Sequence, residues 1–424
     1  MSLILTNRVG QPESYTLQVF EKTGGYQSVK KLFSLQPNQV IDEVKNSGLR
    51  GRGGAGFSAG LKWSFVPQDT GKPVYLCVNA DESEPGTFKD RLLLEDDPHQ
   101  LIEGIIIACY AIRSHTAYIY IRGEFDLPCQ RIRSAVAEAY AKGYLGKNIF
   151  KSGYDLDVTI HRGAGAYICG EETALLESLE GKKGQPRIKP PFPAVVGLFG
   201  SPTVINNVET LSALPFIINH GAAAYRRFGT EKSPGTKLFS VSGHVNKPGV
   251  LEKPLGYPLK DLIEKDCGGV LGGKRLKAVV PGGSSVPVLN AQDVETVKLD
   301  YESLMQHGSM LGSGGVIVLH EGVDMLWALR NLSRFYAHES CGQCTPCREG
   351  SGWVDKILVR FLREGGTSAD IELLKDISNN MMGKTICVLA DALAMPVLSY
   401  LKKFPEDFAA HFRGKTAQAQ MHVL

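Results

Sequence analysis

The sequence predicts an α/β protein with three successive regions: an α/β region, a compact β-rich module and a C-terminal helical bundle. A buried strand, "VYLCVNA" at 74–80, precedes a helix-like apolar run at 105–112, which favours an α/β region. From about residue 235, short β-branched runs alternate with Pro-Gly turns and lead into a short helix. Residues 323–412 have helical spacing, and one apolar stripe contains Val354, Ile357, Leu358, Phe361 and Leu362.

Length and charge exclude several classes of protein. A chain of 424 residues is long enough for several domains, and its 47 basic residues nearly balance its 44 acidic ones. This balance argues against a nucleic-acid-binding surface and against a disordered acidic protein. No apolar run approaches the roughly 18–20 residues that span a bilayer, and the start lacks the features of a signal peptide. We therefore expect a soluble, intracellular chain without direct membrane insertion.

Three cysteines follow one another at two-residue gaps in "ESCGQCTPCREG", which contains Cys341, Cys344 and Cys347. This spacing supplies three corners of an iron–sulfur cubane and leaves the fourth to a distant residue, whereas structural zinc usually takes two separate ligand pairs. In two-cluster ferredoxins the next cysteine comes after three residues, but here that position is Ser351. We therefore predict a [4Fe–4S] cluster, with zinc or no metal as the alternatives.

The remaining six cysteines include one good candidate for the fourth ligand. Cys387 lies downstream in "GKTICVLADAL", at the start of a helix-like run, and Cys169 is the reserve candidate. Cys77 and Cys109 lie in apolar runs and are expected to pack as small hydrophobic residues. A bundle end can bring the triplet and Cys387 together, because each lies between two helical segments.

A glycine-rich segment, "GLRGRGGAGFSAGLKW", spans residues 48–63. Gly51, Gly53 and Gly56 match G-x-G-x-x-G, but a helix rather than a strand precedes them, so this is a weak dinucleotide fingerprint. So many glycines favour a loop whose backbone closely approaches a ligand, and a plain flexible turn is the alternative. Lys62 is available to a phosphate, and nearby phenylalanines could stack on a ring.

Acidic and amide side chains follow the buried strand in "NADESEPGTFKDR" at 79–91. Ligands of open α/β sheets bind at the carboxyl ends of strands, and carboxylates accept hydrogen bonds from ribose hydroxyls or ring N–H groups. A solvated acidic turn is the alternative interpretation.

A second glycine-rich segment at 161–181 ends in a helix whose first turn holds Glu171 and Glu172, where helix capping is the alternative role. The proline-rich segment at 182–211 is predicted to be a rigid surface loop with basic residues, and Asn206 and Asn207 are candidate amide ligands.

These motifs resemble one family: the NADH-binding flavoprotein subunit (F subunit) of respiratory complex I, NADH:quinone oxidoreductase. The resemblance extends over nearly the whole chain and rests on the quoted segments together with "GAGAYICGEETALLESLEG" and "KPPFP". The same core occurs in diaphorase subunits of NAD-reducing hydrogenases and NAD-dependent formate dehydrogenases. Those relatives often carry extra domains that this sequence lacks, which favours complex I.

The resemblance implies FMN, NADH and one [4Fe–4S] cluster as cofactors and substrate. It implies a Rossmann-like FMN/NADH domain at 60–232 after an N-terminal segment at 1–59, a ubiquitin-like β-grasp module at 233–320, and a helical bundle holding the cluster at 321–424. The flavin would lie between a two-electron hydride donor and a one-electron acceptor. No side chain is assigned as a catalytic acid or base.

The resemblance also implies site residues. The implied contacts are Gly51, Gly53, Gly54, Ala55, Gly56 and Lys62 with FMN and NADH; Phe57 and Phe65 with the nucleotide; Asn79, Asp81 and Glu82 with the flavin; Glu84 with the nicotinamide end; Tyr167, Gly170, Glu171 and Glu172 with the shared cavity; Lys189 and Phe192 with the nucleotide; and Asn206 and Asn207 with the flavin side.

The implied partners are a small [2Fe–2S] thioredoxin-like subunit (E subunit) and a larger iron–sulfur subunit (G subunit). The complex would place the chain in the cytoplasm, peripherally on the inner face of the bacterial membrane. The competing class is a non-enzymatic cluster or zinc scaffold whose glycine loops bind a nucleotide for regulation.

Overall fold

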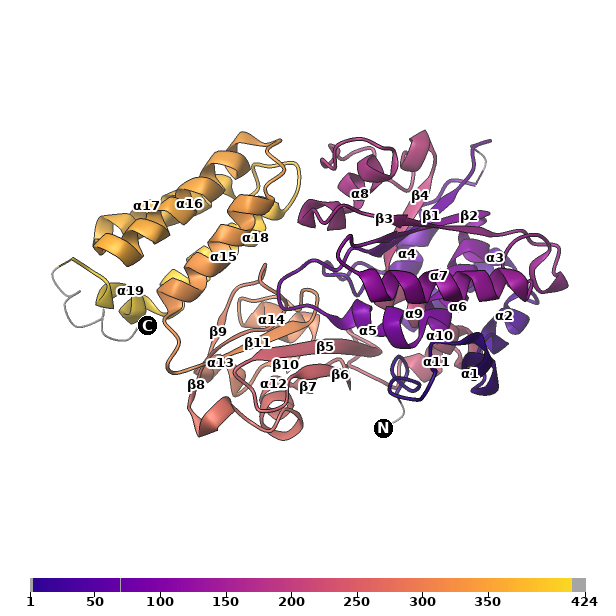
Figure 1. Ribbon diagram of the computed structural model, residues 1–424, viewed down its shortest axis with the longest axis horizontal. Helices are drawn as coiled ribbons and strands as arrows, with labels where there is room; N and C mark the ends of the chain where they lie inside the picture. The colour runs from indigo at the N-terminus through magenta and orange to yellow at the C-terminus, as the bar shows by residue number, and fades with distance from the viewer. Residues whose placement is uncertain (1–2, 69, 414–424) are drawn as a thin grey trace.

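The computed structural model describes residues 3–68 and 70–413, and it contains a parallel sheet, a mixed sheet and a helical bundle. In Figure 1 the parallel sheet and its helices occupy one end of the molecule, the bundle lies at the other, and the mixed sheet lies below and between them. This is the predicted α/β class with a helical C-terminal part.

The first sheet has four parallel strands in the order β3-β2-β1-β4. Their bounds are β1 (Tyr75–Ala80), β2 (Thr116–Ile121), β3 (Asp157–Arg162) and β4 (Thr203–Asn207). The β1–β4 register places Asn79 opposite Asn207. The side chains predicted to bind ligands therefore meet at the carboxyl edge of neighbouring parallel strands, where such sheets bind ligands.

Eleven α-helices accompany this sheet in the described part of the chain. They are α1 (Leu17–Lys22), α2 (Gln27–Leu32), α3 (Pro37–Ser47), α4 (Ala59–Ser64), α5 (Lys89–Asp96), α6 (Pro98–Ile112), α7 (Asp126–Ala141), α8 (Glu172–Leu179), α9 (Val208–Ser212), α10 (Leu214–His220) and α11 (Ala222–Tyr225). Helices α1–α3 share one hydrophobic cluster with β1, β2 and α6. The predicted boundary between residues 59 and 60 falls inside α4, and since α1–α3 pack into the core of the sheet we propose that the described residues up to 232 form one unit.

The predicted rigid loop at 182–211 is wrong at its C-terminal end. Residues Thr203–Asn207 form the edge strand β4, and α9 follows directly. The last proline of the segment is Pro202, and the residues after it include the buried, β-branched Val204 and Ile205, which suit a strand.

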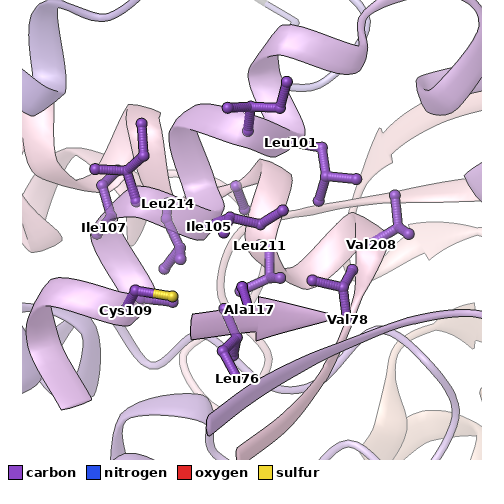
Figure 2. Packing of buried hydrophobic residues seen from close by; sticks show 14 of the residues in the cluster. Leu76, Val78, Leu101, Ile105, Ile107, Cys109, Ala117, Val208, Leu211 and Leu214 are labelled. Atoms are coloured by element: carbon purple, nitrogen blue, oxygen red, sulfur yellow. The ribbon is translucent and has the colours of Figure 1, made fainter. Parts of the chain in front are cut away.

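The core of the first unit lies between the sheet and the helices α6 and α9. Figure 2 shows Leu76 and Val78 of β1 close to α9, with Leu211 between the strand and α6. The other face of β1 carries Cys77, which belongs to a second cluster with residues of α8 and the helical bundle. Cys77 and Cys109 are fully buried, as predicted for small hydrophobic residues.

Gly104 of α6 allows this close approach of α6 to α9. A Cβ atom there would lie 2.1 Å from the carbonyl oxygen of Leu211. Gly104→Ala should therefore lower the free energy of unfolding by at least about 1–3 kcal/mol. Urea unfolding midpoints measure this effect. Gly352→Ala is the matched control, because its Cβ meets nothing within 4 Å inside helix α16, and alanine there should be neutral or stabilise by up to about 1 kcal/mol. Equal midpoints for both variants would contradict the packing argument.

The mixed sheet has five strands in the order β6-β5-β11-β8-β9. Its elements are β5 (Thr236–Gly243), β6 (Gly249–Pro254), α12 (Leu259–Asp261) with a π-helical turn (Leu262–Asp266), β8 (Leu276–Val280), β9 (Leu289–Asn290), α13 (Ala291–Val294), α14 (Tyr301–Gln306) and β11 (Gly315–His320). Strands β7 (Tyr257–Pro258) and β10 (Lys298–Leu299) pair separately. A hairpin, a helix and a last strand placed parallel to the first give the expected β-grasp arrangement.

The C-terminal bundle contains α15 (Met325–Glu339), α16 (Thr345–Glu364), α17 (Ser368–Met381), α18 (Leu389–Lys403) and α19 (Pro405–Ala410). The α15–α16 connection carries the first two cysteines of the triplet, and Cys387 lies between α17 and α18. This confirms the predicted helical region. In the described residues, no helix is both long and apolar enough to cross a membrane.

Candidate functional site

The glycine-rich loop forms a closed turn between α3 and α4. The Gly51 N–H donates to the Phe57 carbonyl at 2.7 Å, and Arg50 and Ser58 form an isolated β-bridge. Tyr301 of α14 donates its hydroxyl to the Gly51 carbonyl at 2.9 Å. Pairing at its base and a contact from the β-grasp module distinguish this loop from a plain flexible turn.

The tip of this loop leaves open space beside the backbone. A Cβ on Gly54 would meet no protein atom within 4 Å, and a Cβ on Gly53 would lie 3.2 Å from the Asn207 Cβ. The aromatic rings predicted to flank a nucleotide, Phe57 and Phe65, are about half exposed and lie 6.2 Å apart between ring centres. Exposed rings beside an open backbone suit a planar ligand.

Lysines and glutamates from three predicted segments meet at the start of α8. Lys62 donates to Glu172 at 2.8 Å, and Lys189 bridges Glu171 at 3.0 Å and Glu172 at 3.2 Å. Burial would raise the pKa of Glu172, but the two ammonium groups hold this pKa below its usual value. Glu171 also caps α8 by accepting from Thr173 and Ala174, so its capping role is real. These lysines are only partly buried and remain accessible to a phosphate.

The carboxylates after β1 have different environments. Asn79 donates to the Gly170 carbonyl at 2.8 Å, which joins two predicted site segments. Asp81 is 7% exposed, and within the described residues its Oδ2 atom has no hydrogen-bond partner. Burial, partly opposed by Arg122, raises the pKa of Asp81 to about 7. An unsatisfied buried oxygen of this kind fits a ligand that donates a hydrogen bond.

The Glu82 carboxylate is occupied by hydrogen bonds from the protein backbone. Its carboxylate accepts from the backbone N–H groups of Lys89, Asp90 and Arg91 at 2.8–3.0 Å and so caps α5. Burial and the neighbouring Asp90 raise its pKa above the usual value. The sequence showed the carboxylate but not that its partners begin seven residues further on.

Glu84 connects three parts of the fold. Tyr167 donates its hydroxyl to Glu84 at 2.6 Å, and the Ser285 N–H of the β-grasp module donates to it at 2.7 Å. Burial raises the pKa of Glu84 against these hydrogen bonds. The structure therefore brings two separately predicted site residues, Glu84 and Tyr167, into direct contact.

Asn206 and Asn207 make protein contacts at the end of β4. Asn206 accepts from the Trp63 indole at 2.9 Å, while Asn207 caps α9 through Glu209 N and donates to Asp90 at 2.7 Å. Phe192 is 59% exposed in the proline-rich loop.

The cysteine triplet and Cys387 belong to one hydrophobic cluster. The Ile386 N–H lies 3.4 Å from the Cys344 sulfur, and the Ser340 hydroxyl lies 3.2 Å from the Cys347 sulfur. Burial raises the pKa of Cys387 to about 12, and the nearby thiols of Cys341 and Cys347 add to this rise.

The donors beside these thiols are compatible with an iron–sulfur cubane. In residues 3–68 and 70–413, no three Cys, His, Asp or Glu side chains form a group that could hold a metal ion. A cubane binds each cysteine at a different iron, so its ligands surround a core instead of converging on a point. Backbone and hydroxyl donors beside two of the sulfurs also suit charged thiolates. The reserve candidate, Cys169, lies instead beside Tyr120 and Ser178, near α8.

The cysteine loop and the residue before it contact both the proline-rich segment and the second glycine-rich segment. Gln185 donates to the Cys341 carbonyl at 3.2 Å, and the Tyr167 N–H donates to Glu339 at 3.0 Å. Tyr167 also packs edge-on against Phe335 of α15, with ring centres 5.1 Å apart. The candidate nucleotide region and the candidate cluster therefore share a contact surface.

A parallel α/β unit with an open glycine loop, joined to a cysteine-bearing bundle, is the arrangement expected of an iron–sulfur flavoprotein. Residues 44–215 match the family described as "Nuo51 FMN-binding domain", and residues 327–411 match "NADH-ubiquinone oxidoreductase-F iron-sulfur binding region". Residues 237–318 match the SLBB domain. The chain belongs to the family of NADH-quinone oxidoreductase F subunits, and FMN and a [4Fe–4S] cluster are its cofactors.

Named relatives cover nearly the whole chain. It is 52% identical over 409 residues to the second NADH-quinone oxidoreductase F subunit of Rhizobium meliloti (strain 1021), covering 96% of this chain and 97% of the relative. It is 53% identical over 418 residues to the NADH-quinone oxidoreductase F subunit of Mycobacterium bovis, covering 97% and 94% of the two chains. A solved NAD⁺-reducing [NiFe]-hydrogenase is similar with a TM-score of 0.84 and 36% identity, covering 97% of this chain and 67% of that one.

Proposed function

We propose that the chain oxidises NADH and passes single electrons through its [4Fe–4S] cluster towards quinone, as the flavoprotein component of a larger complex. The observation that carries this proposal is the contact between the cysteine loop and the nucleotide region through Gln185 and Tyr167. Bound FMN supplies the chemistry that links a hydride donor to a one-electron acceptor. The contact keeps the two regions close together, which favours such a transfer.

The chain's own residues bind and orient the reactants in this proposal. Lys62 and Lys189 supply positive charge for phosphates, while the loop around Gly54 lets the backbone approach a ring. Asp81, whose Oδ2 atom has no protein partner among the described residues, would accept a hydrogen bond from bound flavin, and Glu84, oriented by Tyr167, would serve the nicotinamide end. The other predicted residues that line the same site are Gly51, Gly53, Ala55, Gly56, Phe57, Phe65, Asn79, Gly170, Glu171, Glu172 and Phe192. The site is supported through the protein contacts of Glu82, Asn206 and Asn207 described above.

We also propose that the ligands of the cluster are the triplet and Cys387. The partners would be a small [2Fe–2S] subunit and a larger iron–sulfur subunit, and the assembly would be peripheral on the inner face of the membrane. The likeness to the NAD⁺-reducing hydrogenase favours a second candidate, the diaphorase subunit of such an enzyme. Subunits that co-purify with the native chain distinguish the two, since only a hydrogenase assembly contains a [NiFe] subunit.

The visible spectrum of anaerobically purified protein tests the proposal directly. We expect oxidised flavin absorption that bleaches when NADH is added, together with iron and acid-labile sulfide. Zinc in place of iron, or protein that holds no flavin after reconstitution with FMN, would support the regulatory scaffold instead.

Glu84→Gln and Glu172→Gln should each raise the KM for NADH by about tenfold while FMN stays bound, since a carboxylate is replaced by a neutral amide. Wild-type protein should use NADPH poorly, because its extra phosphate would approach these carboxylates. Steady-state kinetics with both nucleotides, alongside flavin content, measures this. Equal kcat/KM for NADH and NADPH would contradict the assignment. Glu264→Gln, an exposed position in the β-grasp module, is the control.

A further inference from the structure

Two side chains of the β-grasp module donate hydrogen bonds to the backbone of the glycine loop. We infer that Tyr301 and Lys237 of this module are positioning residues for the flavin site, an inference that rests on the proposed function. Neither residue belongs to a motif that suggests ligand binding, and both contact backbone carbonyls of the loop. The module is therefore part of the machinery that shapes the site, in addition to any role as a spacer.

Tyr301 makes the first contact. Its hydroxyl donates to the Gly51 carbonyl at 2.9 Å, and a Cβ placed on Gly56 would lie 2.3 Å from its ring. The Arg50 guanidinium stacks 3.7 Å above the same ring and pairs with Glu302 at 2.8 Å. Tyr301, at the start of α14, therefore contacts both sides of the loop's base, at Gly51 and at Gly56.

Lys237 makes the second contact from β5. It is fully buried, and its ammonium donates to the Arg52 carbonyl at 3.1 Å and to Glu209 at 3.3 Å. Glu209 lies in the first turn of α9, and Asn207, directly before α9, packs against Gly53. The lysine thus ties the loop to the strand end beside it.

Glu209, the carboxylate beside Lys237, keeps other partners when Lys237 is replaced. Glu209 is paired independently with Lys89 at 2.8 Å and accepts from the Leu238 N–H at 2.8 Å. A buried carboxylate left without any partner is strongly destabilising, but here one ammonium remains. Lys237→Met should therefore fold and lose mainly the bond to the Arg52 carbonyl.

The same module also holds the second loop of the site. The Ser285 N–H fixes Glu84, and the Phe88 N–H donates to the Ser240 hydroxyl at 3.0 Å. A Cβ on Gly283 would lie 2.6 Å from the Glu84 side chain, so the two segments are closely packed. Both ligand-facing loops of the first unit consequently take their position from the β-grasp module.

The test compares Tyr301→Phe and Lys237→Met with wild-type holoprotein. The readouts are the FMN dissociation constant from recovered flavin fluorescence, the flavin midpoint potential, and iron per protein. We expect each variant to bind FMN about tenfold more weakly, with a shifted flavin potential and unchanged iron. Tyr257→Phe and Lys260→Met are the controls, because these side chains of the same module contact Lys253 and Glu295, and they should bind FMN within about twofold of wild type.

If both variants keep the FMN affinity and the flavin potential of wild type, the inference is wrong and the proposed function is unaffected. Equal losses in the control variants would also overturn it, because they would show a general effect on the module. Wild-type protein that holds no FMN would overturn the proposed function and this inference together. Tyr301→Phe removes a single oxygen, so it decides the matter even if Lys237→Met does not fold.

Discussion

Cys387→Ala is expected to remove the iron–sulfur cluster or leave a labile three-iron remnant, and to stop electron transfer to partner subunits. The physical reason is that Cys387 packs against the same hydrophobic cluster as Cys341 and Cys347 and, in our proposal, supplies the fourth corner that the triplet lacks. The alanine variants of Cys341, Cys344 and Cys347 should behave alike. Iron per protein and low-temperature EPR after dithionite reduction measure the loss.

The flavin part should continue to work in these variants. Electrons reach the flavin before the cluster, so a folded Cys387→Ala protein should still reduce ferricyanide with NADH. Cys77→Ala, Cys109→Ala and Cys129→Ala are matched controls, because these thiols are buried in the first unit and should keep full iron. An intact [4Fe–4S] signal in Cys387→Ala would move the fourth ligand elsewhere. Cys169→Ala would then be the next variant to measure, because Cys169 is the reserve candidate for the fourth ligand.

Local spacing made the cluster predictable from the sequence. Three thiols at fixed gaps define a chemistry before any fold is known, and helical segments on each side show where a fourth could join them. The strand at 74–80 was equally clear, because its apolar residues are followed at once by polar ones. The edge strand β4 was missed because prolines earlier in the same segment dominated the interpretation.

Contacts between distant segments could not be predicted in this way. Glu82 caps a helix and Asn207 caps another, which only the three-dimensional neighbours reveal. Lys237 and Tyr301 lie 185 and 250 residues from the loop residues whose carbonyls they contact, in a module whose sequence suggested no chemistry. A buried lysine or an ordinary tyrosine carries no pattern by itself, so its role depends on the fold that surrounds it.

Gly54→Val is expected to abolish flavin or nucleotide binding while the protein remains folded with its full iron content. A Cβ at this position meets no protein atom within 4 Å, so the added side chain projects into the space that a ligand ring or phosphate would occupy. Its backbone φ of 150° adds local strain in the loop, away from the bundle and its cysteines. FMN content should fall by about tenfold or more, as measured by flavin released on denaturation.

Gly53→Val should have a similar result by a different route, because its Cβ would press on Asn207 at 3.2 Å and push the loop tip towards the ligand. Gly249→Val in β6 is the matched control, since its Cβ also meets nothing within 4 Å but it lies away from the site. Thermal unfolding and iron content separate loss of ligand from loss of fold. Normal FMN and NADH binding by both loop variants would show that the glycines form only a turn, and the proposed nucleotide contacts would have to lie on another surface of the first unit.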